Sequence, residues 1–525
     1  MFRSLLIANR GEIALRVMRT ARAMGLRTIA VYSEADRDAR HAREADVSIC
    51  IGAPAPRDSY LNIAAIISAA KQSGAEAIHP GYGFLAESAQ FALAVLDAGL
   101  VWVGPPPAAI QGMADKGAAK QLMRESGVPV LPTYKQGDKL EYPVMIKAAA
   151  GGGGRGMRPV RSKAELPDAF AQAKSEAEHA FGDGRLLIEP ALEGARHVEV
   201  QVFADSHGNC VHIGERDCSV QRRHQKLIEE SPSPAVDAAL REQMGKAAIA
   251  AARAVGYTGA GTVEFLLGAD RKFWFMEMNT RLQVEHPVTE AITGFDLVEW
   301  QLRVARGEAL PLRQEEIRFS GHAIEARLCA EDPDHDFLPQ AGTLAIWQAA
   351  PGVRTDHALA SGGQIPPWYD SMIAKVIAHG ASRDEAREQL ARSLDATVAL
   401  GLPTNKSFLA AVLREPSFAR GEATTQYLST HRFPAAQADS STCAIAAALL
   451  AHANGFGEWT RWSNNPAHGM RARFGETEVA LASGGASVRV LEIAGHAARV
   501  ETQGREETLH FAIEGNVVDL ARTGA

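Results

Sequence analysis

A run of four glycines lies in the stretch AAAGGGGRGM at residues 148–157. Successive glycines allow backbone N–H groups to surround phosphate oxygens, which a Cβ atom would obstruct. Lys147 directly precedes the stretch and Lys116 lies on a separate segment, so two ammonium groups are available for a polyphosphate. No Gly-Lys-Ser/Thr follows the glycines, which excludes a Walker A loop. The stretch predicts phosphate binding, and the alternative is a flexible linker.

Two glutamates, Glu264 and Glu277, lie on two predicted strands that a glycine-containing turn joins within residues 262–279. Their carboxylates are therefore expected to face each other across a hairpin. Mg²⁺ takes oxygen ligands from one or two carboxylates together with substrate phosphates, which fits this pair and Asn279. The alternative is two solvent-facing glutamates. The dense charged and amide groups of MEMNTRLQVEHP at 276–287 favour a site instead.

Strands that alternate with helices must position these groups in the first part of the chain. Such alternation predicts an α/β fold with a doubly wound parallel sheet. The turn at residues 8–13 lacks GxGxxG, so a dinucleotide site is not favoured there. The predicted strands are 4–8, 27–32, 47–51, 77–79 and 101–103, and the predicted helices are 11–24, 61–73 and 88–98.

Mixed helix and strand continue to about residue 430, and then the pattern changes. Residues 437–442 are small and polar, which is typical of a linker, and 443–453 are helical in pattern. The final segments are short, alternate in polarity and are separated by glycines, which predicts an antiparallel β unit. They are residues 471–474, 478–481, 487–493, 498–502 and 507–513.

The composition excludes several classes of protein. The 525 residues are 46% hydrophobic and 22% charged, which excludes wholesale disorder and a coiled-coil rod. No apolar run is long enough to span a bilayer. A net charge of −7 gives no general attraction to nucleic acid or acidic membranes. The five cysteines form no CxxC pair, so free thiols in a reducing cytoplasm are expected.

Several long motifs, in this order along the chain, resemble the biotin carboxylase family of ATP-grasp enzymes. The resemblance covers roughly residues 1–430 and is closest to the α subunits of acyl-CoA carboxylases of the methylcrotonyl-, geranyl- or propionyl-CoA type. The motifs are HPGYGFL at 79–85, GGGGRGM at 151–157, ERDCSVQRRHQK at 215–226, EMNTRLQVEHPVT at 277–289, GHAIEAR at 321–327 and YDSMIAK at 369–375.

The resemblance implies four domains. They are a Rossmann-like N-terminal biotin carboxylase domain at 1–114, an ATP-grasp domain at 115–320 with a mobile Gly-rich lid at about 131–195, a mixed α/β C-terminal carboxylase domain at 321–436, and a small helix-plus-antiparallel-β domain at 443–525 that docks a partner subunit. It also implies the reaction of ATP, bicarbonate and biotin to give ADP, phosphate and N1-carboxybiotin through carboxyphosphate.

The resemblance further assigns roles to individual residues. ATP would be contacted by Lys116, Lys147, Gly151, Gly152, Gly153, Gly154, Glu189, Leu192, His197, Gln221 and His224, and Mg²⁺ or Mn²⁺ would be held by Glu264, Glu277 and Asn279. Bicarbonate would be bound by Lys226, Arg281, Val284 and Glu285, with Glu285 as the base, and Arg327 would face the biotin ureido oxygen. Arg281, Glu285, Lys226 and Arg327 would form the catalytic group.

Each of these roles has a simpler alternative. Arg281 and Glu285 would instead form a surface ion pair, His197 and His224 would be structural histidines, and Lys116 would be an ordinary solvated lysine. Another ATP-grasp ligase, a carbamoyl-phosphate-type enzyme and a non-enzymatic scaffold are the alternative functions.

Two departures from the family pattern concern the lid. Pro190 stands where many members carry lysine, which removes a backbone N–H, and the segment at 133–141 is shorter than usual. No lysine follows Lys406, so biotin is expected on another domain or chain. The expected partners are that biotinyl carrier domain and a carboxyltransferase β subunit in a hetero-oligomer.

Overall fold

The computed structural model describes residues 1–135, 138–149, 157–433, 440–453, 470–474, 477–481, 488–502, 505–514 and 517–522. The predicted phosphate-binding glycines, Gly151 to Gly154, lie outside these residues. Among the described residues, no helix combines the length and the apolar character needed to cross a membrane.

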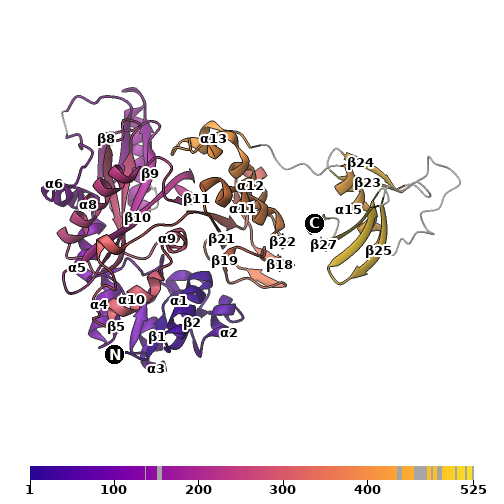
Figure 1. The fold of residues 1–525 in the computed structure, drawn as a ribbon, viewed down its shortest axis with the longest axis horizontal. Helices are drawn as coiled ribbons and strands as arrows, with labels where there is room; N and C mark the ends of the chain where they lie inside the picture. Colours follow the sequence, from indigo (N-terminus) through magenta and orange to yellow (C-terminus); the bar gives the residue numbers. More distant parts are fainter. Residues whose placement is uncertain are drawn as a thin grey trace.

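A parallel sheet forms the N-terminal part of the chain, near the label N at the bottom of Figure 1. Its strand order is β3-β2-β1-β4-β5. Leu5 and Ile7 of β1 pack against Val17 of a helix on one face, while Leu6 packs against Phe91 on the other. A strand covered on both faces reads as a continuous apolar run, and the predicted doubly wound sheet is confirmed. Its elements are β1 (Ser4–Ile7), α1 (Gly11–Ala23), β2 (Arg27–Ser33), α2 (Arg40–Glu44), β3 (Val47–Gly52), α3 (Ile63–Ser73), β4 (Ala77–His79), α4 (Ala89–Asp97), β5 (Val101–Trp102) and α5 (Pro107–Ala114).

An eight-stranded sheet occupies the centre of the molecule, in the order β13-β12-β9-β10-β11-β14-β21-β19. All of its paired strands are antiparallel. Because β11 pairs with β14, the sheet continues across residue 320, where one expected domain ends and the next begins. Its strands are β9 (Arg196–Ala204), β10 (Cys210–Arg222), β11 (Gln225–Ser231), β12 (Gly259–Leu267), β13 (Phe273–Asn279), β14 (His322–Cys329), β19 (Arg354–His357) and β21 (Met372–Gly380).

Helices cover both faces of this central sheet. Val198, Val200 and Val202 of β9 pack against α8 (Ala238–Ala254). The residues between them point to the opposite face, because side chains alternate along a strand. The helices α9 (His286–Thr293) and α10 (Leu297–Ala305) follow β13 in the chain. On β9 the residues that face away from α8 include His197, Glu199 and Gln201. Farther along the strand, Phe203 packs against Trp300 of α10, so the second face carries polar groups at one end and an apolar core at the other.

A smaller sheet in the order β7-β6-β8 carries Lys147 and Glu189 on adjacent strands. Val144, Ile146 and Val160 of this sheet pack against Ala173 of the helix that covers it. Asp115 caps the N-terminus of α6, the helix that precedes this sheet in the chain, by accepting a hydrogen bond from the N–H of Ala118. These elements are α6 (Lys116–Glu125), β6 (Val144–Ala148), β7 (Arg158–Val160), α7 (Leu166–Phe181) and β8 (Leu186–Pro190).

Short strands and helices complete the part of the chain before residue 433. The strands β18 and β22 pair with each other beside the central sheet. The elements are β15 (Glu331–Asp332), β16 (Leu338–Pro339), β17 (Gly342–Leu344), β18 (Ile346–Gln348), β20 (Gly363–Ile365), α11 (Arg383–Ala396), β22 (Val398–Leu400), α12 (Lys406–Arg414), α13 (Pro416–Ala419) and α14 (Tyr427–Thr430).

The C-terminal segment is a helix packed on antiparallel strands, as the sequence predicted, and lies at the right of Figure 1. Ile445 and Leu449 of the helix contact Val500 and Leu509 of the sheet. One strand, β28, was not predicted. The elements are α15 (Ser440–Ala453), β23 (Met470–Phe474), β24 (Thr477–Leu481), β25 (Val488–Ala494), β26 (Ala497–Thr502), β27 (Arg505–Glu514) and β28 (Val517–Arg522).

This C-terminal unit contacts the body of the protein at β22. Ala512 and Ala521 pack against Val398 and Leu400, and the N–H of Gly401 donates a hydrogen bond of 2.9 Å to Asp519 Oδ2.

Candidate active site

A cleft of about 1840 Å³ lies between the N-terminal sheet, the β6–β8 sheet and the polar face of the central sheet. It brings together nearly all of the predicted site residues that the structure describes. Those lining it are Lys116, Lys147, Glu189, Leu192, His197, Gln221, His224, Lys226, Glu264, Glu277, Asn279, Arg281, Val284 and Arg327. Glu285 is completely buried behind this lining. The predicted residues therefore form one site, although they come from segments more than 200 residues apart.

Lys226, on β11, lies at the centre of three buried carboxylates. Its Nζ donates hydrogen bonds to Glu199 Oε2 at 2.6 Å, Glu285 Oε1 at 2.7 Å and Glu264 Oε1 at 2.9 Å. Burial alone would lower the pKa of this ammonium group, but the three carboxylates outweigh that effect and hold the pKa well above its usual range. Lys226 is therefore a permanent positive charge at the floor of the cleft.

Glu285 is held between two cations. Its Oε1 accepts from Lys226, and its Oε2 accepts from Arg327 Nη2 at 2.9 Å. Burial would raise the pKa of the Glu285 carboxyl, but Lys226, Arg327 and Arg216 outweigh it and keep the pKa well below its usual range. The buried side chain is therefore an ionised carboxylate, which is the form that can accept a proton.

Glu264 and Glu277 are directly opposite each other on β12 and β13, as the hairpin predicted. Asn279 Nδ2 donates to Glu264 Oε1 at 2.7 Å, and Lys116 Nζ lies 3.3 Å from Glu277 Oε2. These two carboxylates and the side-chain amide offer only oxygen atoms to a cation, which is the donor set that Mg²⁺ prefers. The residues present therefore fit a divalent cation.

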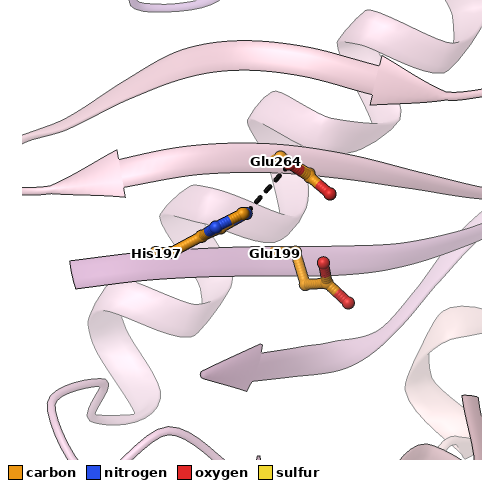
Figure 2. A group of neighbouring side chains, drawn as sticks. All are labelled: His197, Glu199 and Glu264. Carbon is orange, nitrogen blue, oxygen red and sulfur yellow. Dashed lines mark ion pairs between the residues drawn. The ribbon is translucent and has the colours of Figure 1, made fainter. Parts of the chain in front are cut away.

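A second group of potential metal ligands overlaps the first, and Figure 2 shows it: His197, Glu199 and Glu264. His197 Nε2 points toward Glu264 Oε2 at a distance of 2.9 Å. Burial lowers the pKa of this imidazole, but Glu264 outweighs burial and raises the pKa overall. Lys226 binds both carboxylates, so its ammonium group already supplies a positive charge to this cluster.

A cluster of lysines around Glu189 also lines the cleft. This buried carboxylate contacts Lys120 and lies 3.0 Å from Lys147 Nζ. Burial would raise the pKa of Glu189, but Lys147 and Lys120 hold it below its usual range. Burial lowers the pKa of Lys120 to about 8. The surplus of positive charge suits an anionic ligand.

Arg281 is paired with a residue that the sequence did not single out. Its Nε donates to Glu87 Oε2 at 2.9 Å, and the N–H of Thr280 donates to Glu87 Oε1 at 3.1 Å. The predicted alternative of an Arg281–Glu285 surface ion pair is wrong, because Glu285 is completely buried and bonds Lys226 and Arg327. Glu87 lies two residues after the motif HPGYGFL, and no local pattern marks it as a partner of the distant Arg281.

Sequence reasoning also missed two fully buried groups, Glu199 and Arg216. Arg216 donates to Glu199 Oε1 at 2.5 Å, to Gln201 at 2.9 Å and to Thr289 at 2.9 Å. A signal for Glu199 was present, because its position two residues after His197 on a strand places both side chains on one face.

Comparison with known proteins gives matches along most of the chain. Residues 1–110 match the model for the biotin carboxylase N-terminal domain, residues 115–313 the ATP-binding domain of the carbamoyl-phosphate synthase L chain, and residues 325–430 the biotin carboxylase C-terminal domain.

Among curated relatives, biotin carboxylase of Nostoc sp. is 51% identical over 81% of this chain and 98% of its own length. The mitochondrial methylcrotonoyl-CoA carboxylase subunit alpha of Dictyostelium discoideum is 50% identical over 85% of this chain, which spans 66% of that relative.

The fold matches solved structures equally well. The biotin carboxylase–β,γ-ATP complex from Campylobacter jejuni has a TM-score of 0.80 at 46% identity and covers 82% of this chain and 99% of its own. The biotin carboxylase domain of the Hydrogenobacter thermophilus 2-oxoglutarate carboxylase, with MgADP, ADP and bicarbonate, has a TM-score of 0.80 at 43% identity, over 83% of this chain and all of its own. The chain therefore belongs to the biotin carboxylase family, the ATP-dependent ligases that carboxylate biotin.

Proposed function

We propose that the cleft binds ATP, bicarbonate and biotin together and that Glu285 is the base of the reaction. The observation that carries this proposal is the state of Glu285, which is buried, ionised and held between Lys226 and Arg327. Bicarbonate is a poor nucleophile, so a positioned base and flanking cations are required for its attack on a phosphoryl group. The cleft offers both within hydrogen-bond distance of each other.

The nucleotide belongs at the lysine-rich end of the cleft. Lys116 and Lys147 would supply point charges to its phosphates, together with the backbone of Gly151 to Gly154, which lies outside the described residues. The remaining contacts to ATP are assigned to Glu189, Leu192, His197, Gln221 and His224, all of which line the same cleft. Glu189 also fixes Lys147, so it positions a phosphate-binding charge.

Glu264, Glu277 and Asn279 would hold Mg²⁺ or Mn²⁺, which when bound neutralises negative charge on the nucleotide phosphates. Their oxygen donors suit such a cation better than the overlapping group, because that group includes the imidazole nitrogen of His197.

Bicarbonate is assigned to the space bounded by Lys226, Arg281, Val284 and Glu285. Arg281 offers a planar guanidinium to a planar anion, and Glu87 fixes the orientation of that group from behind. Glu285 takes the proton of bicarbonate, and the oxygen so freed attacks the γ-phosphorus of ATP to give carboxyphosphate and ADP. Arg327 then stabilises the negative charge that develops on the biotin ureido oxygen.

The biotin is proposed to arrive on a carrier domain or chain, and the resulting complex is proposed to include a carboxyltransferase β subunit. The helix-plus-β unit at 443–525 is the proposed docking domain for that subunit. The relative from Dictyostelium is named a subunit alpha, which supports the proposal that this chain assembles with another subunit. The boundaries 1–114, 115–320, 321–436 and 443–525 remain the proposed domain divisions, and one sheet continues across the second of them.

A carbamoyl-phosphate-type reaction is the second candidate, because residues 115–313 match the ATP-binding domain of that enzyme. The two candidates differ in what accepts the activated carboxyl group. Phosphate release from ATP, Mg²⁺ and bicarbonate separates them when free biotin or ammonia is added. Stimulation by biotin supports the proposed function, and stimulation by ammonia alone contradicts it.

A further inference from the structure

Lys375 is a completely buried lysine outside the set of residues so far assigned a role. It lies on β21, directly opposite Arg327 on β14 and Asp356 on β19. Directly opposite residues in antiparallel strands share one face of a sheet. Lys375 therefore lies on the face that carries Arg327, one strand away from it. It is not one of the described residues that line the cleft.

The closest partner of the Lys375 ammonium is a main-chain carbonyl of the proposed bicarbonate site. Nζ donates a hydrogen bond of 2.9 Å to the carbonyl oxygen of Val284. This carbonyl belongs to the peptide that joins Val284 to Glu285. The preceding carbonyl, of Gln283, accepts from His286 Nδ1 at 2.8 Å. Side chains therefore fix the carbonyls of both residues that precede Glu285, Gln283 and Val284.

The negative partners of Lys375 are farther away than this carbonyl. Glu12 Oε1, from α1, lies 3.4 Å from Nζ, and Asp356 Oδ2 lies 4.0 Å from it. The Tyr82 ring centre lies 5.8 Å from Nζ. Burial raises the pKa of Glu12 to about 7 although Lys375 opposes this, so Glu12 is an incomplete counter-charge near neutral pH. Removal of an ammonium group from water is costly, and a purely structural role would favour closer carboxylates.

We propose that Lys375 is a positioning residue that fixes the Val284–Glu285 peptide and thereby places the base against bicarbonate. This inference rests on the proposed bicarbonate site. Lys375 does not line the cleft, so we expect its effect to be confined to the step in which bicarbonate reacts. Lys116 and Lys147 pair instead with Glu277 and Glu189, so their positions do not depend on Lys375.

The test is Lys375→Met in the full chain, with steady-state phosphate release measured while bicarbonate and ATP are varied separately. Loss of a hydrogen bond from a charged group predicts a fall of about 10- to 100-fold in kcat/KM for bicarbonate. The KM for ATP is expected to change by less than about twofold. The control is Lys406→Met, because Lys406 also donates to a main-chain carbonyl, that of Thr397 at 2.7 Å, and belongs to none of the site. Lys406→Met should leave both kcat/KM for bicarbonate and KM for ATP unchanged.

A second change separates positioning from stability. Lys375→Met leaves Glu12 without its cation and should lower Tm, and adding Glu12→Gln should recover part of that loss because no buried charge is then left unpaired. The kcat/KM for bicarbonate should stay low in the double variant. Recovery of the kinetics together with Tm, or a wild-type kcat/KM in Lys375→Met, overturns the inference.

A third variant keeps the inference testable if Lys375→Met does not fold. Asp356→Asn removes a counter-charge and retains the bond from Lys375 to Val284, so Tm should fall while kcat/KM for bicarbonate stays within about twofold. A tenfold loss in Asp356→Asn contradicts positioning through Val284. Absence of bicarbonate-dependent cleavage in the wild type contradicts the proposed function itself, which is a different result.

Discussion

Replacing Lys226 by methionine removes the ammonium group that Glu199, Glu264 and Glu285 share. Methionine fills a similar volume without a charge, so the change leaves three buried carboxylates close together with less compensation. One of them is then expected to bind a proton, because like charges in a buried site raise the pKa of one another. The variant should therefore be less stable than the wild type, by an amount that depends on pH.

The magnitude follows from the cost of that proton. A carboxyl of ordinary pKa 4.5 requires about 3 kcal/mol to be protonated at pH 7, at about 1.4 kcal/mol for each pH unit. This agrees with about 3–5 kcal/mol for removing one partner of a buried ion pair. We therefore expect Lys226→Met to lower the free energy of unfolding by about 3 kcal/mol at pH 7.

The sign of the pH dependence is also fixed. In the wild type, the lowered pKa values of Glu264 and Glu285 contribute stability that is present above pH 4.5 and is lost at lower pH. In the variant, the folded state holds an extra proton, so its stability decreases as pH rises. The difference in free energy of unfolding between the wild type and Lys226→Met should therefore decrease by up to about 3 kcal/mol as the pH falls from 8 to 6.

Urea titrations at pH 6, 7 and 8 measure this difference. The control is Lys246→Met, since Lys246 pairs with Glu242 at 3.1 Å on an exposed helix face and should change stability by less than about 1 kcal/mol at every pH. A destabilisation by Lys226→Met below about 1 kcal/mol, or a destabilisation that grows as pH falls, would contradict the role of Lys226 as the shared cation of the three carboxylates.

Two further predictions concern single contacts. The pKa of His197 is raised by Glu264, so its stabilising effect is complete below pH 6.5 and is lost as pH rises through the raised value. In the His197→Gln variant the fall of Tm between pH 6 and pH 9 should be shallower, and an identical slope in thermal melts would contradict the pairing. Asp519→Ala should remove the hydrogen bond to the N–H of Gly401, which is worth about 1 kcal/mol. Hydrogen exchange at that N–H should therefore accelerate about fivefold. Unchanged exchange would show that this contact does not hold the C-terminal unit to β22.

Local patterns predicted some of the elements that carry the site, but not β11, which carries Lys226, or β14, which carries Arg327. The strands around Glu264 and Glu277 were predicted as a pair joined by a glycine-containing turn, and their carboxylates are opposite each other as expected. The parallel N-terminal sheet was predictable for a similar reason, because continuous apolar runs between helices have few other ways to be buried.

The contacts that fix the charge states were not predictable in this way. Glu87 meets Arg281 across nearly 200 residues, and Lys375 meets Val284 across 91. Such pairs depend on how the separate sheets pack, and the spacing of residues along the chain does not predict that packing. Arg216 illustrates the same limit, because its complete burial depends on Glu199 from a neighbouring strand.

The sixth C-terminal strand, β28, was missed for a local reason. Residues 517–522 read VVDLAR, and Asp519 interrupts the apolar pattern. The structure shows that this aspartate accepts the bond from Gly401, so the polar residue serves a contact outside its own sheet.

The most direct test of the account is bicarbonate-dependent cleavage of ATP by the Glu285→Gln variant. Glutamine keeps the shape of the side chain and cannot take a proton, so phosphate release with Mg²⁺, bicarbonate and biotin should fall by about 100-fold or more. The Kd for ATP, measured by calorimetry, should stay within about twofold because the lysine-rich end of the cleft is intact. Unchanged turnover in Glu285→Gln would contradict the assignment of Glu285 as the base.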